Sequence, residues 1–382
     1  MIFDEVKLKD IATILNGRAY NQNELLEDGK YKVLRVGNFF TSDRWYFSDL
    51  ELDENKYCNF GDLLYAWSAN FGPKIWNEGK TIFHYHIWKI ELKENIDKSY
   101  IFYYLKFITD RLKNSTHGSV MMHLTKVDME NQIIRLPSYN IQKKIGKILS
   151  NIDSKMELNN QINDNLSEII ERMFINFLEK HNEELVTLED AVKKIGTGAD
   201  AIQRAPIVEY DTGIRCIRVG DMTNSRNRYE WGFTEMTEKD FDNYKLDIGD
   251  IVVTRTAVNG LSYMIEDDMK VVCNNGLIRM KVNEKYNPMF IYLYLKTKDF
   301  NEYVHRIDGE TSVRPNMKVN YFTSYKIMKI SKEEQDEICN RLLPLRNKQK
   351  QIIEENNTLT QLRDTLLPKL MNGEIDLDKI EI

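Results

Sequence analysis

The chain has 382 residues, 42% of them hydrophobic, which is enough for two domains of ordinary size with buried cores. It contains no apolar run long enough for a transmembrane helix, and its acidic, mixed N-terminus is unlike a signal peptide. The formal net charge of −6 argues against a protein that coats nucleic acid without a partner, but it is compatible with a sequence reader whose Arg and Lys residues are clustered.

The four cysteines lie far apart and form no CxxC pair. So few cysteines in a chain of this length are typical of a reducing cytosol rather than of a disulfide framework. The sequence therefore predicts a cytoplasmic protein. The cysteines are Cys58, Cys216, Cys273 and Cys339.

In chain order, residues 1–137 are predicted to form a mixed α/β domain, which we call the first head. A helix is expected at residues 8–15, followed by short strands rich in Val, Ile, Tyr and Trp and separated by glycines. Two of these strands carry the phrases RVGNF at 35–39 and FGDLLYAW at 60–67. Residues at helical spacing predict a helix at 98–114, and a short strand is expected to end the head.

A long helix is predicted at residues 138–182. The segment has one glycine and no proline, and its apolar residues recur at near-heptad spacing. This pattern indicates a helix of about 40 residues, or about 60 Å at 1.5 Å per residue, whose apolar seam can pair with a second helix. The seam residues are Leu149, Ile152, Met156, Leu166, Ile170 and Met173.

The rest of the chain repeats the first part. RVGNF returns as RVGDM at residues 218–222, and FGDLLYAWSANFG returns as IGDIVVTRTAVNG at 248–260. Four further segments match in the same order, so we predict a second head at residues 183–330, with helices at 188–195 and 287–306. A second long helix is predicted at residues 331–376.

The second long helix carries an equivalent seam. Asn163 and Asn356 occupy equivalent positions in the two helices, where each either fixes the register of the seam or faces solvent. Pro344 removes one backbone hydrogen bond, so a kink or a helix start is expected there, with a similar effect at Pro368. The seam residues are Leu342, Ile352, Leu359 and Leu366.

These elements predict an α+β protein with two tandem α/β domains and two long helices that form an antiparallel coiled coil. Antiparallel pairing would place the two heads at opposite ends of a rod. Such an object is expected to act as a spacer that holds two heads at a fixed distance.

No motif for catalysis is found. The chain lacks a P-loop, a GxGxxG phrase, the NPPY or DPPY motif of adenine methyltransferases, and the CxxC and HExxH metal motifs. His84 and His86 share one face of a predicted strand, but the second head has Asn274 and Gly276 at those places. We therefore predict no metal site, and we expect the acidic pair at residues 267–268 to be solvated in a polar turn.

Basic and polar residues in turn-like segments are the candidates for DNA contacts. Arginine can bond a guanine edge in two places, while Lys and Ser hold phosphate. Trp67 and Ser68 of the first head correspond to Arg255 and Thr256 of the second. Two domains with the same backbone fold but different side chains at such positions are suited to recognise different base sequences. For any single arginine the alternative is a solvated surface charge. The candidates are Arg18, Arg44, Trp67, Ser68 and Lys74 in the first head and Arg204, Arg226, Arg228, Arg255, Thr256 and Arg314 in the second.

Arg35 and Arg218 are weaker candidates because both lie inside the repeated phrase. A residue that stays constant between two heads is of little use for reading two different sequences. We expect both arginines to support the frame.

Several segments together resemble a known family. The C-terminal LRDTLLPKLMNGEIDL at residues 362–377, the mid-chain LPSYNIQKKIGKIL at 136–149 and the helical SEIIERMFINF at 167–177 are similar to the corresponding parts of type I restriction-modification specificity (S) subunits. The RVG and GD strands look like those of that family's two target recognition domains. The resemblance covers essentially the whole chain, including its internal repeat.

This resemblance implies a non-catalytic subunit. Each head would be a target recognition domain that reads one half of a split double-stranded DNA target through the major groove, and the helices would set the number of unspecified bases between the halves. Two methyltransferase subunits would dock on the chain, and restriction (motor-nuclease) subunits would join for cleavage. AdoMet, ATP and Mg would belong to those partner subunits and not to this chain.

Two alternatives come from other classes of protein. A stand-alone DNA methyltransferase or nuclease would show activity as a purified single chain with AdoMet or Mg. A two-headed coiled-coil scaffold that binds proteins would show no dependence on DNA, even with a methyltransferase present.

Overall fold

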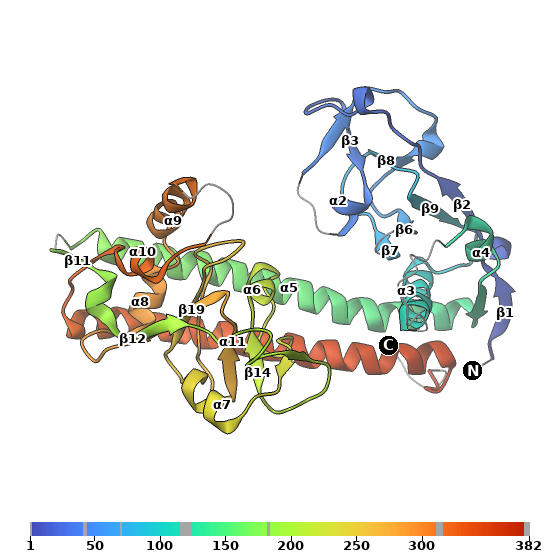
Figure 1. The fold of residues 1–382 in the computed structure, drawn as a ribbon. Coiled ribbons are helices and arrows are strands. Elements are labelled where there is room, and N and C mark those ends of the chain that lie inside the picture. Colours follow the sequence, from blue (N-terminus) through green and yellow to red (C-terminus); the bar gives the residue numbers. More distant parts are fainter. Residues whose placement is uncertain are drawn as a thin grey trace. The chain divides into compact units, whose positions relative to one another are not determined.

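The computed structural model of the chain describes residues 2–40, 44–68, 71–114, 124–181, 184–310 and 316–377. Two long helices, α5 (Tyr139–Leu178) and α11 (Lys332–Asn372), are drawn in green and red in Figure 1. The chain divides into two units. Unit 1 comprises Met1–Glu157 and Thr358–Ile382, and unit 2 comprises Leu158–Asn357. Each unit therefore contains one head together with part of both long helices.

The first head is built on two four-stranded sheets and one separate strand pair. Its strands are β1 (Asp4–Lys7), β2 (Ala12–Asn16), β3 (Tyr31–Leu34), β4 (Tyr46–Ser48), β5 (Tyr57–Cys58), β6 (Leu63–Ala66), β7 (Gly72–Ile75), β8 (Thr81–Phe83), β9 (Ile87–Leu92) and β10 (Ile133–Leu136). The sheet β2-β9-β6-β7 is antiparallel throughout, whereas the sheet β4-β3-β8-β5 contains the parallel pair β3 and β8. Its helices are α1 (Leu8–Ile11), α2 (Val36–Phe40), α3 (Lys98–Asn114) and α4 (Lys126–Glu130), with 3-10 turns at Gln22–Glu24 and Glu54–Lys56.

The second head repeats this topology except at one sheet edge, where β13 pairs with β15 whereas β5 of the first head pairs with β8. Its strands are β11 (Leu185–Thr187), β12 (Val192–Thr197), β13 (Ile207–Val208), β14 (Arg215–Ile217), β15 (Phe233–Thr234), β16 (Ile251–Thr254), β17 (Ser262–Met264), β18 (Val271–Cys273), β19 (Leu277–Val282) and β20 (Lys326–Met328). The sheet β12-β19-β16-β17 is antiparallel, and the sheet β13-β15-β14-β18 contains the parallel pair β14 and β18. Its helices are a 3-10 turn at Leu188–Ala191, α6 (Val219–Thr223), α7 (Glu238–Tyr244), α8 (Pro288–Tyr294), α9 (Lys298–Glu310) and α10 (Val319–Thr323). The predicted tandem α+β architecture is confirmed.

Each head shares its main hydrophobic core with the ends of both long helices. In unit 1 the core contains Ile141, Ile145 and Leu149 of α5 and Leu367, Leu370 and Met371 of α11. In unit 2 it contains Ile170, Phe174 and Leu178 of α5 and Ile338, Cys339 and Leu342 of α11. Because full burial of one large apolar side chain contributes about 1.5–3 kcal/mol, the helix ends are part of the fold of each head.

A buried glutamine joins each long helix to its head. Gln142 on α5 donates from Nε2 to the carbonyl oxygen of Pro137 at 2.9 Å, and its Oε1 accepts the backbone N–H of Asp97 at 2.9 Å. Gln335 on α11 makes the equivalent two bonds in the second head and is 0% exposed. These amides therefore tie the start of each long helix to the segment just before it and to the start of α3 or α8.

The two long helices are antiparallel in both units. In unit 1, Arg363 pairs with Asp153 at 3.0 Å and the Thr360 hydroxyl lies 3.4 Å from the Met156 sulfur. The residue number therefore falls along α11 as it rises along α5. In unit 2, Asn356 bonds Asn159 whereas Gln349 bonds Ser167, which gives the same direction.

Ten seam residues were predicted, and all are removed at least partly from solvent. Leu149, Ile170 and Leu342 are also core residues of a head, so they serve both helix pairing and head packing. The buried ones are Leu149, Ile152, Ile170, Leu342 and Ile352, and the half-buried ones are Met156, Leu166, Met173, Leu359 and Leu366.

The middle of the seam is polar within unit 2. The Asn159 Nδ2 donates to Asn356 Oδ1 at 2.8 Å, and the Asn356 Nδ2 donates to Asn160 Oδ1 at 2.9 Å. The Gln349 Nε2 donates to the Asn163 carbonyl oxygen at 3.2 Å. Of the two alternatives for Asn356, the seam position is therefore correct.

Three predicted elements differ from the structure. The opening helix at residues 8–15 is wrong beyond its first turn, because α1 ends at Ile11 and the alternating burial of Ala12, Thr13 and Ile14 places them on β2. The helix predicted at 188–195 is wrong in the same way, because a 3-10 turn ends at Ala191 and β12 begins at Val192. The predicted helix at 287–306 is broken between α8 and α9. The Thr297 side chain accepts the backbone N–H of Phe300 at 3.3 Å and so starts a new helix.

The RVG phrase and Pro344 also differ from expectation. The phrase was predicted as strand, but most of it lies in α2 and α6, immediately after β3 and β14. Pro344 does not start a helix, because α11 begins at Lys332 and continues through it. Pro344 lies on the exposed face of α11, where water can bond the carbonyl group that the proline leaves without an amide partner.

Candidate nucleic-acid interface

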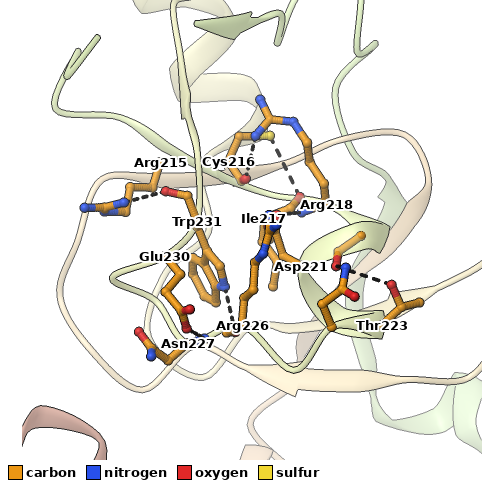
Figure 2. A network of polar contacts seen from close by, with 12 residues as sticks. Arg215, Cys216, Ile217, Arg218, Asp221, Thr223, Arg226, Asn227, Glu230 and Trp231 are labelled. Carbon is orange, nitrogen blue, oxygen red and sulfur yellow. Dashed lines mark hydrogen bonds and ion pairs between the residues drawn. The ribbon is translucent and has the colours of Figure 1, made fainter. Parts of the chain in front are cut away.

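The repeated RVG phrase lies where a strand passes into a short helix. In the second head, the Asp221 carboxylate accepts the backbone N–H of Arg218 at 2.9 Å, and Arg218 Nη1 donates to the carbonyl oxygen of Cys216 at 3.0 Å. Figure 2 shows these side chains around the start of α6. In the first head, the Arg35 guanidinium packs over the Tyr46 ring at 5.0 Å. Both arginines thus contact the frame of their own head, as expected for residues that are constant between the heads.

The segment after α6 is held by its own hydrogen bonds (Figure 2). Arg226 Nη1 pairs with Asp221 Oδ1 at 3.1 Å, and Trp231 Nε1 donates to the Arg226 carbonyl oxygen at 3.2 Å. The Glu230 carboxylate accepts the backbone N–H of Asn227 at 2.9 Å. Trp231 is buried, whereas half of the Arg226 side chain is exposed. Arg226 is therefore oriented by the head and still accessible.

Arg228, two residues further on, is buried and paired. Its Nη1 lies 2.7 Å from Asp267 Oδ2, and its Nη2 lies 2.7 Å from Glu354 Oε1 on α11. Arg346 on α11 adds a bidentate pair with Glu266 at 2.8 and 3.3 Å. Removing one partner of a buried ion pair is strongly destabilising, so the Arg228 guanidinium is committed to the contact between the head and α11.

The same contacts correct the expectation for residues 267–268. Asp267 is not simply solvated, because it pairs with Arg228 and, at 2.8 Å, with Lys350. A sequence signal for this ionic cluster exists: Arg346, Lys350 and Glu354 recur every four residues and so share one face of α11. Sequence reasoning missed it because the acidic turn lies about 80 residues away along the chain.

A pocket of about 470 Å³ lies in unit 2 between the segment after α6 and the polar middle of the seam. Its lining combines cationic groups of the head with amides and one carboxylate of the helices. The polar lining residues include Arg226, Arg228 and Lys296 from the head and Asn160, Asn163, Asp164 and Asn356 from the helices. Arg226 is already paired with Asp221, and Arg228 with Asp267 and Glu354, so their charges are largely balanced within the protein.

Trp67 and Arg255 reach the same place in the two heads. Trp67 Nε1 donates to the carbonyl oxygen of Tyr85 at 2.8 Å, and Arg255 Nη1 donates to the carbonyl oxygen of Asn275 at 3.2 Å. Arg255 Nη2 also donates to Asn316 Oδ1 at 2.9 Å. Both side chains therefore hold the turn that follows β8 in one head and β18 in the other.

Two cations of the first head are engaged by neighbouring groups. Arg18 makes a bidentate pair with Glu24 at 2.7 and 3.2 Å, and this pair lowers the pKa of the Glu24 carboxyl. Lys74 Nζ donates to the carbonyl oxygen of Phe39 at 3.0 Å, and burial lowers the pKa of its ammonium group. Both side chains contribute to local structure in the first head.

Arg44 and Arg204 are exposed. The Arg44 guanidinium lies 5.4 Å from the centre of the Tyr46 ring. Arg204 Nη1 donates to the Tyr244 hydroxyl at 2.6 Å. Both side chains therefore lie at the surface of their heads.

The last three candidates fall into two groups. Ser68 is half-buried, and Thr256 is half-buried in an isolated bridge with Asn316. Arg314 lies outside the described residues. Within the second head the structure gathers Arg226 with Arg228 at one pocket, and a DNA contact stays a prediction for each candidate.

His84 and His86 of the first head lie close together, and within the described residues no third metal-ligating group joins them. The His84 and His86 ring centres are 4.8 Å apart. Burial, with the charges of His86 and Arg35, lowers the pKa of His84 to about 4. In the part of the chain that the structure describes, no group of three His, Cys, Asp or Glu side chains could hold a metal ion. All four cysteines are buried and unbridged.

None of the helices in the described ranges combines the length and apolar character needed to cross a membrane. The two longest, α5 and α11, expose charged residues along their outer faces. Such faces are typical of helices that pair in water through one apolar stripe.

Comparison with known proteins finds one family. The model of the "Type I restriction modification DNA specificity domain" matches the chain twice, at residues 3–168 and 184–361. The specificity subunit of the type I restriction enzyme MjaVIII from Methanocaldococcus jannaschii is 24% identical over 349 residues, which cover 83% of this chain and 80% of that protein. The specificity subunit of MjaIX from the same organism is 25% identical over 330 residues, covering 75% and 71%.

Among solved structures, the S subunit of a type I restriction-modification system from M. genitalium has a similar fold. Its TM-score is 0.56 at 16% sequence identity, over 96% of each chain. At this identity the likeness concerns the fold, which here includes both heads and both long helices.

Proposed function

Because the chain belongs to the family of type I restriction-modification DNA specificity domains, we propose that it is the specificity subunit of a type I restriction-modification complex. Each head reads one half of a split double-stranded DNA target. The observation that carries this proposal is the repeated frame: the two heads share the strand order of their antiparallel sheet, a parallel strand pair in the other sheet and the RVG phrase, yet differ in the side chains they expose. A constant frame with variable surface groups suits two readers of different sequences.

The chain itself is non-catalytic in this proposal, and its partners supply the chemistry. Two methyltransferase subunits bind it, which is consistent with the presence of two similar heads, and restriction subunits join them for cleavage. AdoMet, ATP and Mg are bound by those subunits, in the cytoplasm. Partners that bring positive surface to the DNA would compensate the net charge of −6. The paired helices set the number of bases between the two half-sites.

The decisive experiment compares the methylome of the source strain with and without this gene. We expect N6-methyladenine to disappear at one split motif and to remain elsewhere. A second arm mixes the purified chain with AdoMet and DNA, alone and with its methyltransferase partner, and methylation is expected only in the mixture. Methylation or cleavage by the chain alone would contradict the proposal in favour of a stand-alone enzyme.

A further inference from the structure

One tight turn is built in the same way in both heads. It comprises residues 84–86 between β8 and β9 in the first head and residues 274–276 between β18 and β19 in the second. In each head this turn joins a strand of one four-stranded sheet to a strand of the other. The turn therefore lies at the junction of the two sheets.

The middle residue of each turn is fixed by its backbone on both sides. The Tyr85 N–H donates to the carbonyl oxygen of Arg18 at 3.0 Å, and the Asn275 N–H donates to the carbonyl oxygen of Ala199 at 2.8 Å. Their carbonyl oxygens accept the side-chain hydrogen bonds from Trp67 and Arg255 described above. Although the donor side chain differs, the backbone of the turn is held in the same way.

A glycine makes room for each turn. A Cβ atom on Gly17 would lie 2.3 Å from the carbonyl oxygen of His84, and one on Gly198 would lie 2.2 Å from that of Asn274. No side chain tolerates such an approach to a backbone oxygen, so both positions require glycine.

The strand that leads into the repeated phrase supports the turn from the other side. The His84 N–H donates to the carbonyl oxygen of Leu34 at 2.9 Å, and the Asn274 N–H donates to that of Ile217 at 3.2 Å. Leu34 and Ile217 are the residues immediately before Arg35 and Arg218 of the RVG phrase. The last strand residue before each copy of the phrase therefore supports the same turn in both heads.

The side chains at the middle of the turn are exposed, and they differ. Tyr85 is 40% exposed, and Asn275 is exposed while its neighbours Asn274 and Gly276 are not. The Tyr85 ring lies 4.4 Å from the His84 ring, centre to centre. The surface at this place is therefore aromatic in the first head and an amide in the second.

We infer that Tyr85 and Asn275 are the specificity-determining residues of the two heads, an inference that rests on the proposed function. They combine a backbone fixed by equivalent hydrogen bonds with an exposed side chain that changes between the heads. The Asn275 Nδ2 lies 3.5 Å from Asp200 Oδ2, at the outer limit of a hydrogen bond. The side-chain donors of Trp67, Arg255 and Arg228 are bonded within the protein at 2.8, 3.2 and 2.7 Å.

The chemistry of the two side chains sets the expected bases. An asparagine amide can donate to N7 and accept from N6 of adenine in the major groove, so Asn275 is assigned to an adenine. An aromatic ring makes apolar contact with the methyl group of thymine, so Tyr85 is assigned to a thymine. Each assignment concerns one base pair of one half-site.

The test uses the full chain in complex with its methyltransferase partner. Methylation rates are measured on DNA duplexes in which every position of both half-sites is varied singly. Asn275→Ala is expected to reduce discrimination at one A·T pair of one half-site on the order of 10- to 100-fold and to leave the other half-site unchanged. Asn275→Gln keeps the amide and is expected to retain the preference for adenine. Tyr85→Ala should affect one base pair of the opposite half-site.

Matched controls are Asn243→Ala, an exposed asparagine on α7 of the second head, and Phe60→Ala, an exposed aromatic residue of the first. Both are expected to leave every base preference intact. If the wild-type complex methylates a split motif but Asn275→Ala and Tyr85→Ala keep its base preferences, the inference is overturned while the proposed function stands. If the wild-type complex methylates no split motif, the proposed function itself fails.

Discussion

At the scale of single residues, the backbone around Gly198 leaves no room for a side chain. Gly198→Ala would place its Cβ 2.2 Å from the carbonyl oxygen of Asn274, so the turn must move. We expect the free energy of unfolding to fall by about 1–3 kcal/mol, as for other overpacked sites, measured by urea denaturation. The control is Gly220→Ala in α6, where a Cβ meets nothing within 4 Å and alanine favours the helix. Equal stability of the two variants would contradict this prediction.

His84 gives the first head a dependence on pH. Its pKa is lowered from 6.5 to about 4, first by burial and then by His86 and Arg35, so the unfolded chain binds a proton that the folded head does not. The neutral ring therefore stabilises the fold above pH 6.5, and this stability is lost as the pH falls from 6.5 to about 4. His84→Asn, which copies Asn274 of the second head, should flatten the change in unfolding free energy across that range. An unchanged pH profile would show that His84 is not the titrating group.

The candidate site could be located in the sequence only in part. The repeat correctly paired Trp67 with Arg255, and the structure places both against the same turn. It could not show that these side chains point into the protein, because an arginine that bonds a backbone carbonyl has the same sequence signature as one that faces DNA. The aligned turns at 84–86 and 274–276 already show a middle residue that differs between the heads, Tyr85 or Asn275. Only the residues on either side of it suggested a function, as possible metal ligands.

At the scale of elements, the polar layer of the helix pair is the feature to test. Asn159 on α5 is 1% exposed and bonds Asn356 and Glu355 of α11. Asn159→Ala would leave the Asn356 oxygen without this buried donor, so we expect a loss of about 1–3 kcal/mol in unfolding free energy. Asn165→Ala, on the exposed face of the same helix, should change stability by less than about 0.5 kcal/mol. A calorimetric scan of both variants separates the two outcomes.

Element prediction succeeded for the long helix, where one hydrophobic period persists over 40 residues, and for a strand that is a continuous apolar run. The helix expected at 138–182 is observed at Tyr139–Leu178, and the strand in GDLLYAW is observed at Leu63–Ala66. It failed at residues 8–15, because four residues of helix followed by five of strand are too short for either period to stand out. It also failed at Thr297, where a side-chain cap interrupts an otherwise helical pattern. Both failures lie at places where a tertiary contact or a cap decides the outcome.

At the scale of the whole chain, the two units show that a head does not end where its sequence repeat ends. The core of the second head includes Ile170, Phe174 and Leu178 of α5 and Ile338, Cys339 and Leu342 of α11. The repeat boundaries at the strand pair β11 and β20 leave these six residues outside. The hydrophobic pattern could not reveal this, because a helix that is apolar on one face has the same sequence pattern whether it packs against another helix or against a sheet.

This division of the core decides how a head can be exchanged. Grafting residues 186–328 from another family member places a new sheet against the old helix ends, whereas grafting residues 170–342 moves the complete core. Because each large apolar side chain is worth about 1.5–3 kcal/mol when it is well buried, the shorter graft should unfold at a lower temperature than the longer one. Both folded chimeras, assayed for methylation with the methyltransferase partner, should change one half-site to that of the donor and keep the other. A chimera that changed both half-sites, or neither, would show that the heads do not read the target separately.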